Sequence, residues 1–200
     1  REAVVQSAAE GAGREVATGI LGYGDRSKRS RGSAWQTGAW GLFVKITAWR
    51  IVQARHLPGA FTGVGARDFP GRWNERGIPV VYMAGSLSLA AMEMLVHLGH
   101  ADMLNLYLSI PVRFDESFCR RLASSDLPPD WAAYPVPAST RALGTQWATD
   151  GLSAVLAVPS AIVPIETVFV LNPRHPDFSK IAIGDASEFR FDPRLLRRGE

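Results

Sequence analysis

The stretch VVYMAGSLSLAAMEMLVHL, residues 80–98, joins a strand pattern directly to a helix pattern. Val80–Met83 is apolar and β-branched, which predicts a buried strand. Ser86 can cap a helix predicted over Leu87–Leu98, and Gly99 provides its stop signal. Because a buried strand runs straight into a helix that is apolar on nearly every side, this stretch predicts a core in which sheet and helix pack against each other.

The segments on both sides of this stretch continue the mixture of strands and helices. Further elements are predicted as strands over Trp49–Val52, Leu104–Val112, Leu152–Val158 and Thr167–Leu171, and as a helix from Ser139 or Thr140 to about Thr149. They interleave without a regular βαβ repeat, so we predict an α+β fold, a single domain of mixed β-sheets and helices over residues 49–200. Residues 1–48 are rich in glycine and carry a basic run at 26–31, which predicts a flexible N-terminal extension, either native or added.

The composition limits the classes of function. With 46% hydrophobic residues, the 200-residue chain can bury one sizeable core. The net charge of +3 is too small to require nucleic acid, although it suits an anionic small ligand. No apolar run approaches the roughly 18 residues of a membrane span, and no signal-peptide pattern begins the chain. The single cysteine, Cys119, excludes an internal disulfide and a multi-cysteine zinc site. We therefore expect a cytoplasmic protein with no metal, no membrane contact and no direct nucleic-acid binding.

The loop GVGARDFPGRWN, residues 63–74, is the densest signal for a binding site. Its glycines let a ligand approach the backbone, and the forked donors of Arg67 and Arg72 suit phosphate oxygens. Trp73 could offer a face to a base or a nicotinamide ring. The spacing matches neither a Walker loop nor a dinucleotide fingerprint. From the residues alone, a surface turn with two solvated arginines remains an equal alternative.

Three more residues are candidates, each with a plainer alternative. Glu93 lies within an apolar helix, where a carboxylate could stabilise a developing oxocarbenium ion or could simply mark the exposed stripe. Ser160 follows a predicted strand and could hydrogen-bond a substrate or cap a turn. Tyr82 could stack on a ring or belong to the core.

Taken in order, these segments resemble the RES domain, a family named for its characteristic arginine, glutamate and serine. The matching motifs are Trp49-Arg50-Ile51-Val52, Gly65-Ala66-Arg67, Gly71-Arg72-Trp73-Asn74, Pro79-Val80-Val81-Tyr82, Leu89-Ala90-Ala91-Met92-Glu93-Met94-Leu95-Val96-His97, Val158-Pro159-Ser160-Ala161-Ile162-Val163-Pro164 and Leu171-Asn172-Pro173-Arg174-His175-Pro176. They span about residues 49–178. The chain departs from the family at Trp49, where tyrosine is usual, and at Thr167, where asparagine is common.

The resemblance implies a fold like that of ADP-ribosyltransferases and an activity that cleaves the nicotinamide–ribose bond of NAD+. NAD+ would be the substrate, no cofactor would be needed, and water or phosphate would accept the ADP-ribose. By motif, Arg50 and Arg72 would hold the pyrophosphate, Tyr82 would stack near nicotinamide, Glu93 would stabilise the cationic transition state and Ser160 would contact the substrate.

The resemblance also implies weaker assignments and a partner. Arg67 is a less certain substrate-binding residue, because family members vary around it, and Trp73 completes the predicted binding set. The implied partner is a Xre-type DNA-binding antitoxin whose C-terminal part blocks the cleft. Two alternatives stay open, a protein ADP-ribosyltransferase toxin and a catalytically silent nucleotide- or partner-binding module. The oligomeric state also stays open, a homo-oligomer included.

Overall fold

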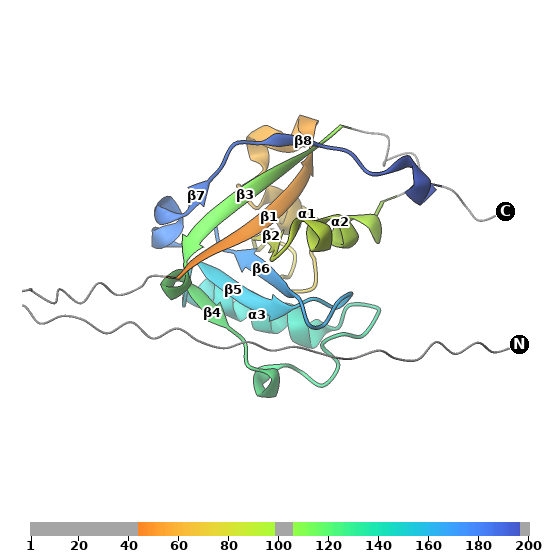
Figure 1. Cartoon of the computed structure of the whole chain (residues 1–200). Helices are drawn as coiled ribbons and strands as arrows, with labels where there is room; N and C mark the ends of the chain where they lie inside the picture. Colours follow the sequence, from red (N-terminus) through yellow and green to blue (C-terminus); the bar gives the residue numbers. More distant parts are fainter. Residues whose placement is uncertain (1–43, 99–105, 197–200) are drawn as a thin grey trace, which may run out of the picture. The chain divides into compact units, whose positions relative to one another are not determined.

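A computed structural model describes residues 44–98 and 106–196 of the chain (Figure 1). The strands are β1 (Lys45–Gln53), β2 (Val81–Ala84), β3 (Tyr107–Asp115), β4 (Cys119–Arg121), β5 (Val155–Pro159), β6 (Thr167–Leu171), β7 (Ala182–Ile183) and β8 (Ser187–Phe189). The α-helices are α1 (Val64–Asp68), α2 (Leu87–Leu95) and α3 (Ala138–Asp150). Short 3₁₀ helices occupy Ala54–Gly59, Glu116–Phe118, Ser124–Asp126, Pro176–Lys180 and Pro193–Leu196.

The described strands form one sheet in the order β4-β5-β6-β2-β1-β3-β7, with β8 also paired to β3. β4 and β5 run parallel, and the other pairs are antiparallel. The long pairing of β1 with β3 and the central pairing of β2 with β6 hold the middle of the sheet. One mixed sheet with helices confirms the predicted α+β class.

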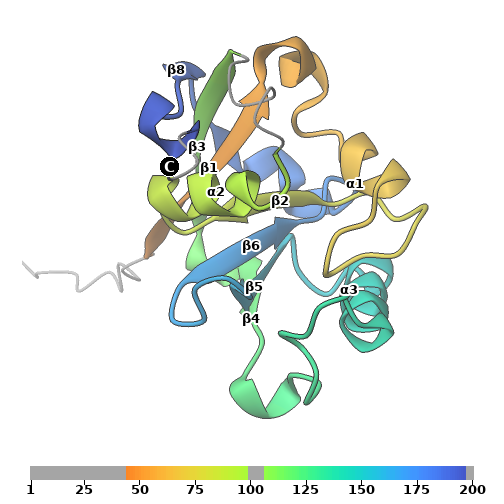
Figure 2. The ribbon, with the colours of Figure 1, turned by 90° about the vertical axis from the view of Figure 1, so that its right-hand side faces the viewer.

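Each face of the sheet has its own core, because successive strand residues point to opposite sides. On one face, Ile51, Val158 and Val170 pack with Leu89 of α2 and Trp147 of α3. Figure 2 looks at this side, where α2 lies over the sheet and α3 lies beside it. The other face buries a second apolar set, which includes Ala48, Val81, Met83, Val112 and Phe169.

The stretch from β2 to α2 folds as its sequence predicts, with one difference at its end. Ser86 is the N-cap of α2, and its Oγ accepts a hydrogen bond from the backbone N–H of Leu89 at 3.0 Å. The helix ends at Leu95 rather than at Leu98, and Val96 and His97 form a turn. Their backbone N–H groups still bond to the carbonyls of Met92 and Met94.

Several elements differ from the sequence prediction. β1 begins at Lys45, four residues before the expected strand, and β3 runs on to Asp115 through its pairing with β1. The short elements α1, β4, β7 and β8 were not predicted, because two to five residues carry too little periodicity to be recognised. The predicted extension over residues 1–48 lies outside the described residues apart from its last five, of which 45–48 belong to β1. None of the described helices is long and apolar enough to cross a membrane.

Candidate active site

Glu93 and Ser160 form a hydrogen-bonded pair, although they are 67 residues apart in the sequence. α2 carries Glu93, and Ser160 follows the last residue of β5. The Ser160 hydroxyl donates to Oε1 of Glu93 at 2.7 Å and accepts the backbone N–H groups of Ile162 and Val163 at 3.1 and 3.0 Å. Ser160 is fully buried, whereas Glu93 keeps some accessible surface. Ser160 therefore acts through the carboxylate that it orients, because its own buried hydroxyl offers no surface for a direct substrate contact.

Tyr82 is fixed by a buried network that sequence reasoning did not assign. Its hydroxyl donates to Oδ1 of Asn74 at 2.8 Å and accepts the backbone N–H of Trp73 at 2.8 Å. Asn74 is fully buried, and its Nδ2 also donates to the carbonyls of Ala66 and Ile78 at 2.7 and 3.1 Å. Burial raises the pKa of Tyr82 above its usual value, so this hydroxyl stays protonated at neutral pH.

Arg72 lies beside this network and shares its surroundings with Glu93. Nη1 of Arg72 donates to the carbonyls of Trp131 and Ala133 at 2.6 and 3.0 Å. Burial lowers the pKa of Arg72, and the negative charge of Glu93 acts in the opposite direction. The guanidinium and the Glu93 carboxylate are therefore close enough to interact electrostatically.

Arg50 lines a neighbouring cavity of about 210 Å³ together with Tyr82 and several glycines, among them Gly63 and Gly71. Its Nη1 donates to the carbonyl of Tyr82 at 2.8 Å, whereas its buried Nε has no hydrogen-bond partner among the described residues. Burial lowers the pKa of Arg50 to about 10, which leaves the guanidinium charged at neutral pH. A positive charge held in a cavity without a carboxylate favours an anionic ligand.

Glycine at position 71 leaves room for the Tyr82 ring at the wall of the cavity. A Cβ atom built on Gly71 would lie 2.7 Å from the hydroxyl of Tyr82, closer than real contacts allow. Any side chain there would displace the Tyr82 ring, which lines the cavity and whose hydroxyl accepts the backbone N–H of Trp73, the residue after Arg72. Tyr82 thus joins the surroundings of Arg50 to those of Arg72 and Glu93.

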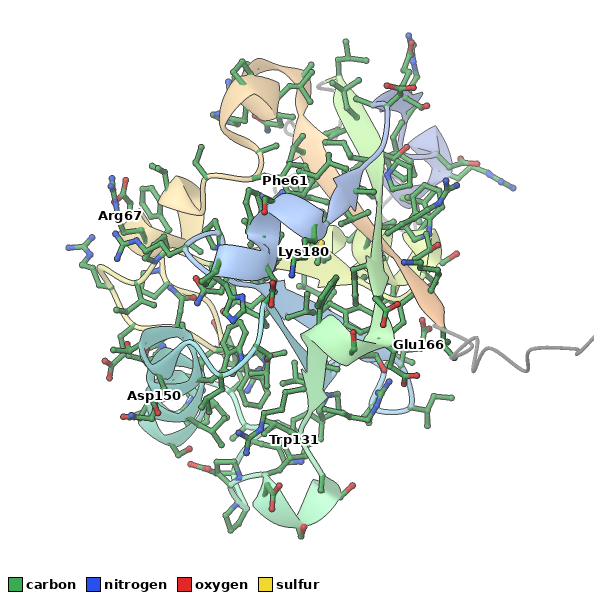
Figure 3. All side chains as sticks on the ribbon, turned by 90° about the vertical axis from the view of Figure 1, so that its left-hand side faces the viewer. Phe61, Arg67, Trp131, Asp150, Glu166 and Lys180 are labelled. Carbon is green, nitrogen blue, oxygen red and sulfur yellow. The ribbon has the colours of Figure 1, made fainter. Side chains whose placement is uncertain are left out.

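Two predicted binding residues do not join this group. Arg67 on α1 pairs with Asp68 at 2.8 Å, and Figure 3 shows it at the outer edge of the molecule. Trp73 is only 2% exposed and belongs to the core that α2 and α3 share. A side chain so deeply buried offers no face to a ligand, so Trp73 serves the core rather than a stacking site. The structure brings together Arg72, Tyr82 and the Glu93–Ser160 pair, with Arg50 in the adjoining cavity.

Metal ligands are not gathered in this region. Within residues 44–98 and 106–196, no group of three or more His, Cys, Asp or Glu side chains is placed to hold a metal ion. The charged groups of this region are instead Arg72, the Glu93 carboxylate that acts on it, and Arg50 in the adjoining cavity. This arrangement suits a substrate that has anionic groups at one point and develops positive charge at another.

Comparison with known proteins identifies relatives over the same region. The family model described as RES domain matches residues 47–192. "Toxin Res" of Yersinia enterocolitica is 38% identical over 148 residues, which cover 74% of this chain and 97% of that protein. The "Prs ADP-ribosylating toxin" of a Sphingobium species is 38% identical over 155 residues, or 75% of this chain and 96% of that protein.

A solved structure has the same fold. One chain of the M. tuberculosis MbcT–MbcA toxin–antitoxin complex superposes with a TM-score of 0.60 at 17% sequence identity. The match covers 77% of this chain and 88% of that chain. At this identity the likeness establishes the fold and leaves the reaction to be argued from the site.

Proposed function

The chain belongs to the RES domain family, whose matching curated relatives include toxins, and from that premise we propose that it is a toxin, paired with an antitoxin, and that it degrades NAD+. The reaction cleaves the bond between nicotinamide and ribose, with water or phosphate as acceptor. The observation that carries this proposal is the Glu93 carboxylate, held by Ser160 at 2.7 Å within the electrostatic range of Arg72.

Glu93 supplies the charge that the bond cleavage needs. As the C1′–N bond lengthens, its electron pair moves to the nicotinamide nitrogen and the ribose develops oxocarbenium character. A carboxylate fixed in advance stabilises that positive charge without rearranging during the reaction. The oxygen of water or phosphate then forms the new bond to C1′, and for water a proton is released. Ser160 is a positioning residue, because its hydroxyl orients the carboxylate.

The arginines and the tyrosine fit the remaining parts of the dinucleotide. Arg72 and Arg50 are positively charged, and both are held near Tyr82. Phosphate oxygens accept the forked donors of a guanidinium, so we assign the pyrophosphate to this side of the cleft. Tyr82 lines the cavity with Arg50 and holds the loop of Arg72 through its hydroxyl, which suits a contact with nicotinamide or ribose.

NAD+ consumption by the purified protein, with and without phosphate, tests the proposal directly. We expect rapid loss of NAD+ that Glu93→Gln abolishes and that the matched Glu166→Gln retains. A dependence on phosphate would identify the acceptor. Folded wild-type protein that leaves NAD+ intact would reject NAD+ degradation.

Transfer of ADP-ribose to a protein is the second candidate reaction. The observation that favours it is the 38% identity to a relative named as an ADP-ribosylating toxin. Incubation with NAD+ labelled in its adenylate part separates the two reactions. Free ADP-ribose or its phosphorylated product supports degradation, whereas label retained on a protein after denaturation supports transfer.

We also propose an antitoxin partner and a cytoplasmic site of action, where NAD+ is available. The structural neighbour comes from a toxin–antitoxin complex, which supports such a partner for this fold. We expect a Xre-type antitoxin to suppress NAD+ consumption when it is mixed with this chain in equal amounts. Full turnover in a stable complex would contradict blocking of the cleft.

A further inference from the structure

Some of the described arginines are neutralised by a carboxylate, and others are not. Arg67, Arg190 and Arg194 each pair with a nearby carboxylate. Arg72, in the loop at residues 71–75, and Arg141, on α3, have no carboxylate within ion-pair distance in the part of the chain that the structure describes. They donate to backbone carbonyls instead. A carbonyl satisfies a donor but does not neutralise the positive charge, and the Glu93 carboxylate acts on Arg72 only from beyond ion-pair distance.

Arg141 is held beside the loop that carries Arg72. It lies on the first turns of α3, is half-buried, and its Nε donates to the carbonyl of Gly71 at 3.4 Å. Gly71 immediately precedes Arg72 in the chain. The described residues offer no hydrogen-bond partner to the two terminal amino groups of Arg141, so they remain available to a ligand.

The packing of α3 fixes Arg141 in this position. Gly144, three residues further along α3, allows so close an approach that a Cβ there would lie 2.1 Å from the carbonyl oxygen of Trp73. Thr145 accepts the backbone N–H of Glu75 through its Oγ1 at 2.9 Å. Two neighbouring residues of the helix therefore pack it on the same loop, which fixes the backbone position from which the Arg141 side chain extends.

The charge of Arg141 acts on Arg72 and Tyr82. Burial lowers the pKa of Arg72, the negative charge of Glu93 opposes that effect, and the positive charge of Arg141 adds a smaller lowering. For Tyr82, burial raises the pKa, and the positive charges of Arg141 and Arg72 oppose that rise. Two like charges held close together without a shared carboxylate repel each other, and an anion between them removes the repulsion.

We propose that Arg141 is a substrate-binding residue that, together with Arg72, holds a phosphate group of a dinucleotide. The proposal rests on the proposed function and adds to it a second helix of the cleft. Arg141 comes from α3 and Arg72 from the loop at residues 71–75, and Arg141 donates to the residue before Arg72. We therefore expect the two guanidinium groups to contact different oxygens of one phosphate. Neither the glycine-rich loop nor the family motifs include Arg141.

Equilibrium binding of ADP and of adenosine by calorimetry tests this assignment without requiring turnover. We expect Arg141→Gln to weaken ADP binding about 10-fold or more, with adenosine affinity unchanged, because only ADP carries the phosphates. Arg141→Lys keeps the charge and should recover part of the loss. The control is Arg113→Gln on β3, an exposed arginine separated from β2 by β1, and it should bind ADP as the wild type does.

Turnover gives a second, independent readout. In Arg141→Gln we expect the KM for NAD+ to rise by a similar factor, with kcat changed less than about 3-fold, because a uniform binding contact is lost. ADP binding that is unchanged in folded Arg141→Gln, or wild-type protein that binds ADP no better than adenosine, would overturn the proposal. Arg141-dependent ADP binding by a protein that leaves NAD+ intact would uphold the phosphate contact while rejecting NAD+ degradation.

Discussion

Two serine–glutamate pairs connect α2 to the turn between β5 and β6, and only one of them belongs to the candidate active site. Near the end of α2, Glu93 accepts the hydroxyl of Ser160 at 2.7 Å. At its start, Ser86 donates to Oε2 of Glu166 at 2.9 Å and caps the helix. In both pairs the serine hydroxyl donates to the carboxylate and accepts backbone N–H groups. The local chemistry is therefore nearly the same.

The difference lies in what surrounds each carboxylate. The negative charge of Glu93 opposes the lowering of the Arg72 pKa by burial, and Arg72 belongs to the loop at residues 71–75, beside Tyr82. Glu166 instead lines a separate hollow with Leu122, Pro164 and Ile165, and Ile165 is 95% exposed. Figure 3 shows Glu166 on the opposite side of the view from Arg67. A hydrogen-bonded glutamate becomes a candidate catalytic group through the charges that face it, and the pairing itself does not distinguish the two.

Replacing each glutamate by glutamine should distinguish the two pairs most clearly. Glu93→Gln keeps an oxygen that accepts the Ser160 hydroxyl but removes the negative charge. We expect kcat for NAD+ consumption to fall about 100-fold or more, the scale of one lost transition-state contact. Glu166→Gln should keep turnover within about 3-fold of the wild type. Equal losses in the two variants would show that Glu93 contributes through structure alone.

Removing the charge that faces Glu93 should give the next largest effect. Arg72→Gln leaves a polar side chain near the carbonyls of Trp131 and Ala133, but it removes the guanidinium. We expect kcat/KM for NAD+ to fall about 10-fold to 100-fold, as for loss of a charged hydrogen bond. The matched variant, Arg121→Gln, lies beside the hollow of Glu166 and should leave kcat/KM unchanged. A loss in both would indicate a general effect of net charge.

Replacing Ser160 tests whether turnover depends on the hydroxyl that orients Glu93. Ser160→Ala removes the hydroxyl that orients Glu93 and leaves two backbone N–H groups without an acceptor, so turnover should fall about 10-fold and the free energy of unfolding by about 1–3 kcal/mol. Combined with Glu93→Gln, it should lower kcat little further, because Ser160 acts through Glu93. Fully additive losses would contradict a positioning role.

The smallest effect on turnover is expected from replacing Ser86, the N-cap of α2. Ser86→Ala removes the acceptor for the Leu89 N–H and the donor to Glu166. We expect the free energy of unfolding to fall by about 1 kcal/mol, as for other N-cap losses, while kcat for NAD+ stays near that of the wild type. Chemical denaturation and initial rates on the same preparation measure both quantities. A large loss of turnover at unchanged stability would place Ser86 in the site.

The sequence predicted the strand, the cap and the start of the helix in residues 80–98, because each depends on neighbours in the chain. It also identified the family motifs from which Arg72, Tyr82, Glu93 and Ser160 come. It did not predict the burial of Trp73, the network around Asn74 or the position of Arg141. These arise from contacts between segments up to 70 residues apart, such as that of Arg141 with Gly71. No local periodicity reports such contacts.

The amino-acid sequence by itself determined the α+β class, the apolar faces of the strands, the capping of α2 and the family motifs. The physical reason is that periodicity, capping and backbone preference act over a few residues. Only the tertiary structure decided which carboxylate influences Arg72 and which one accepts the hydroxyl of the N-cap serine. Burial and electrostatic pairing depend on distances through space, and those exist only once the sheet and its helices have packed.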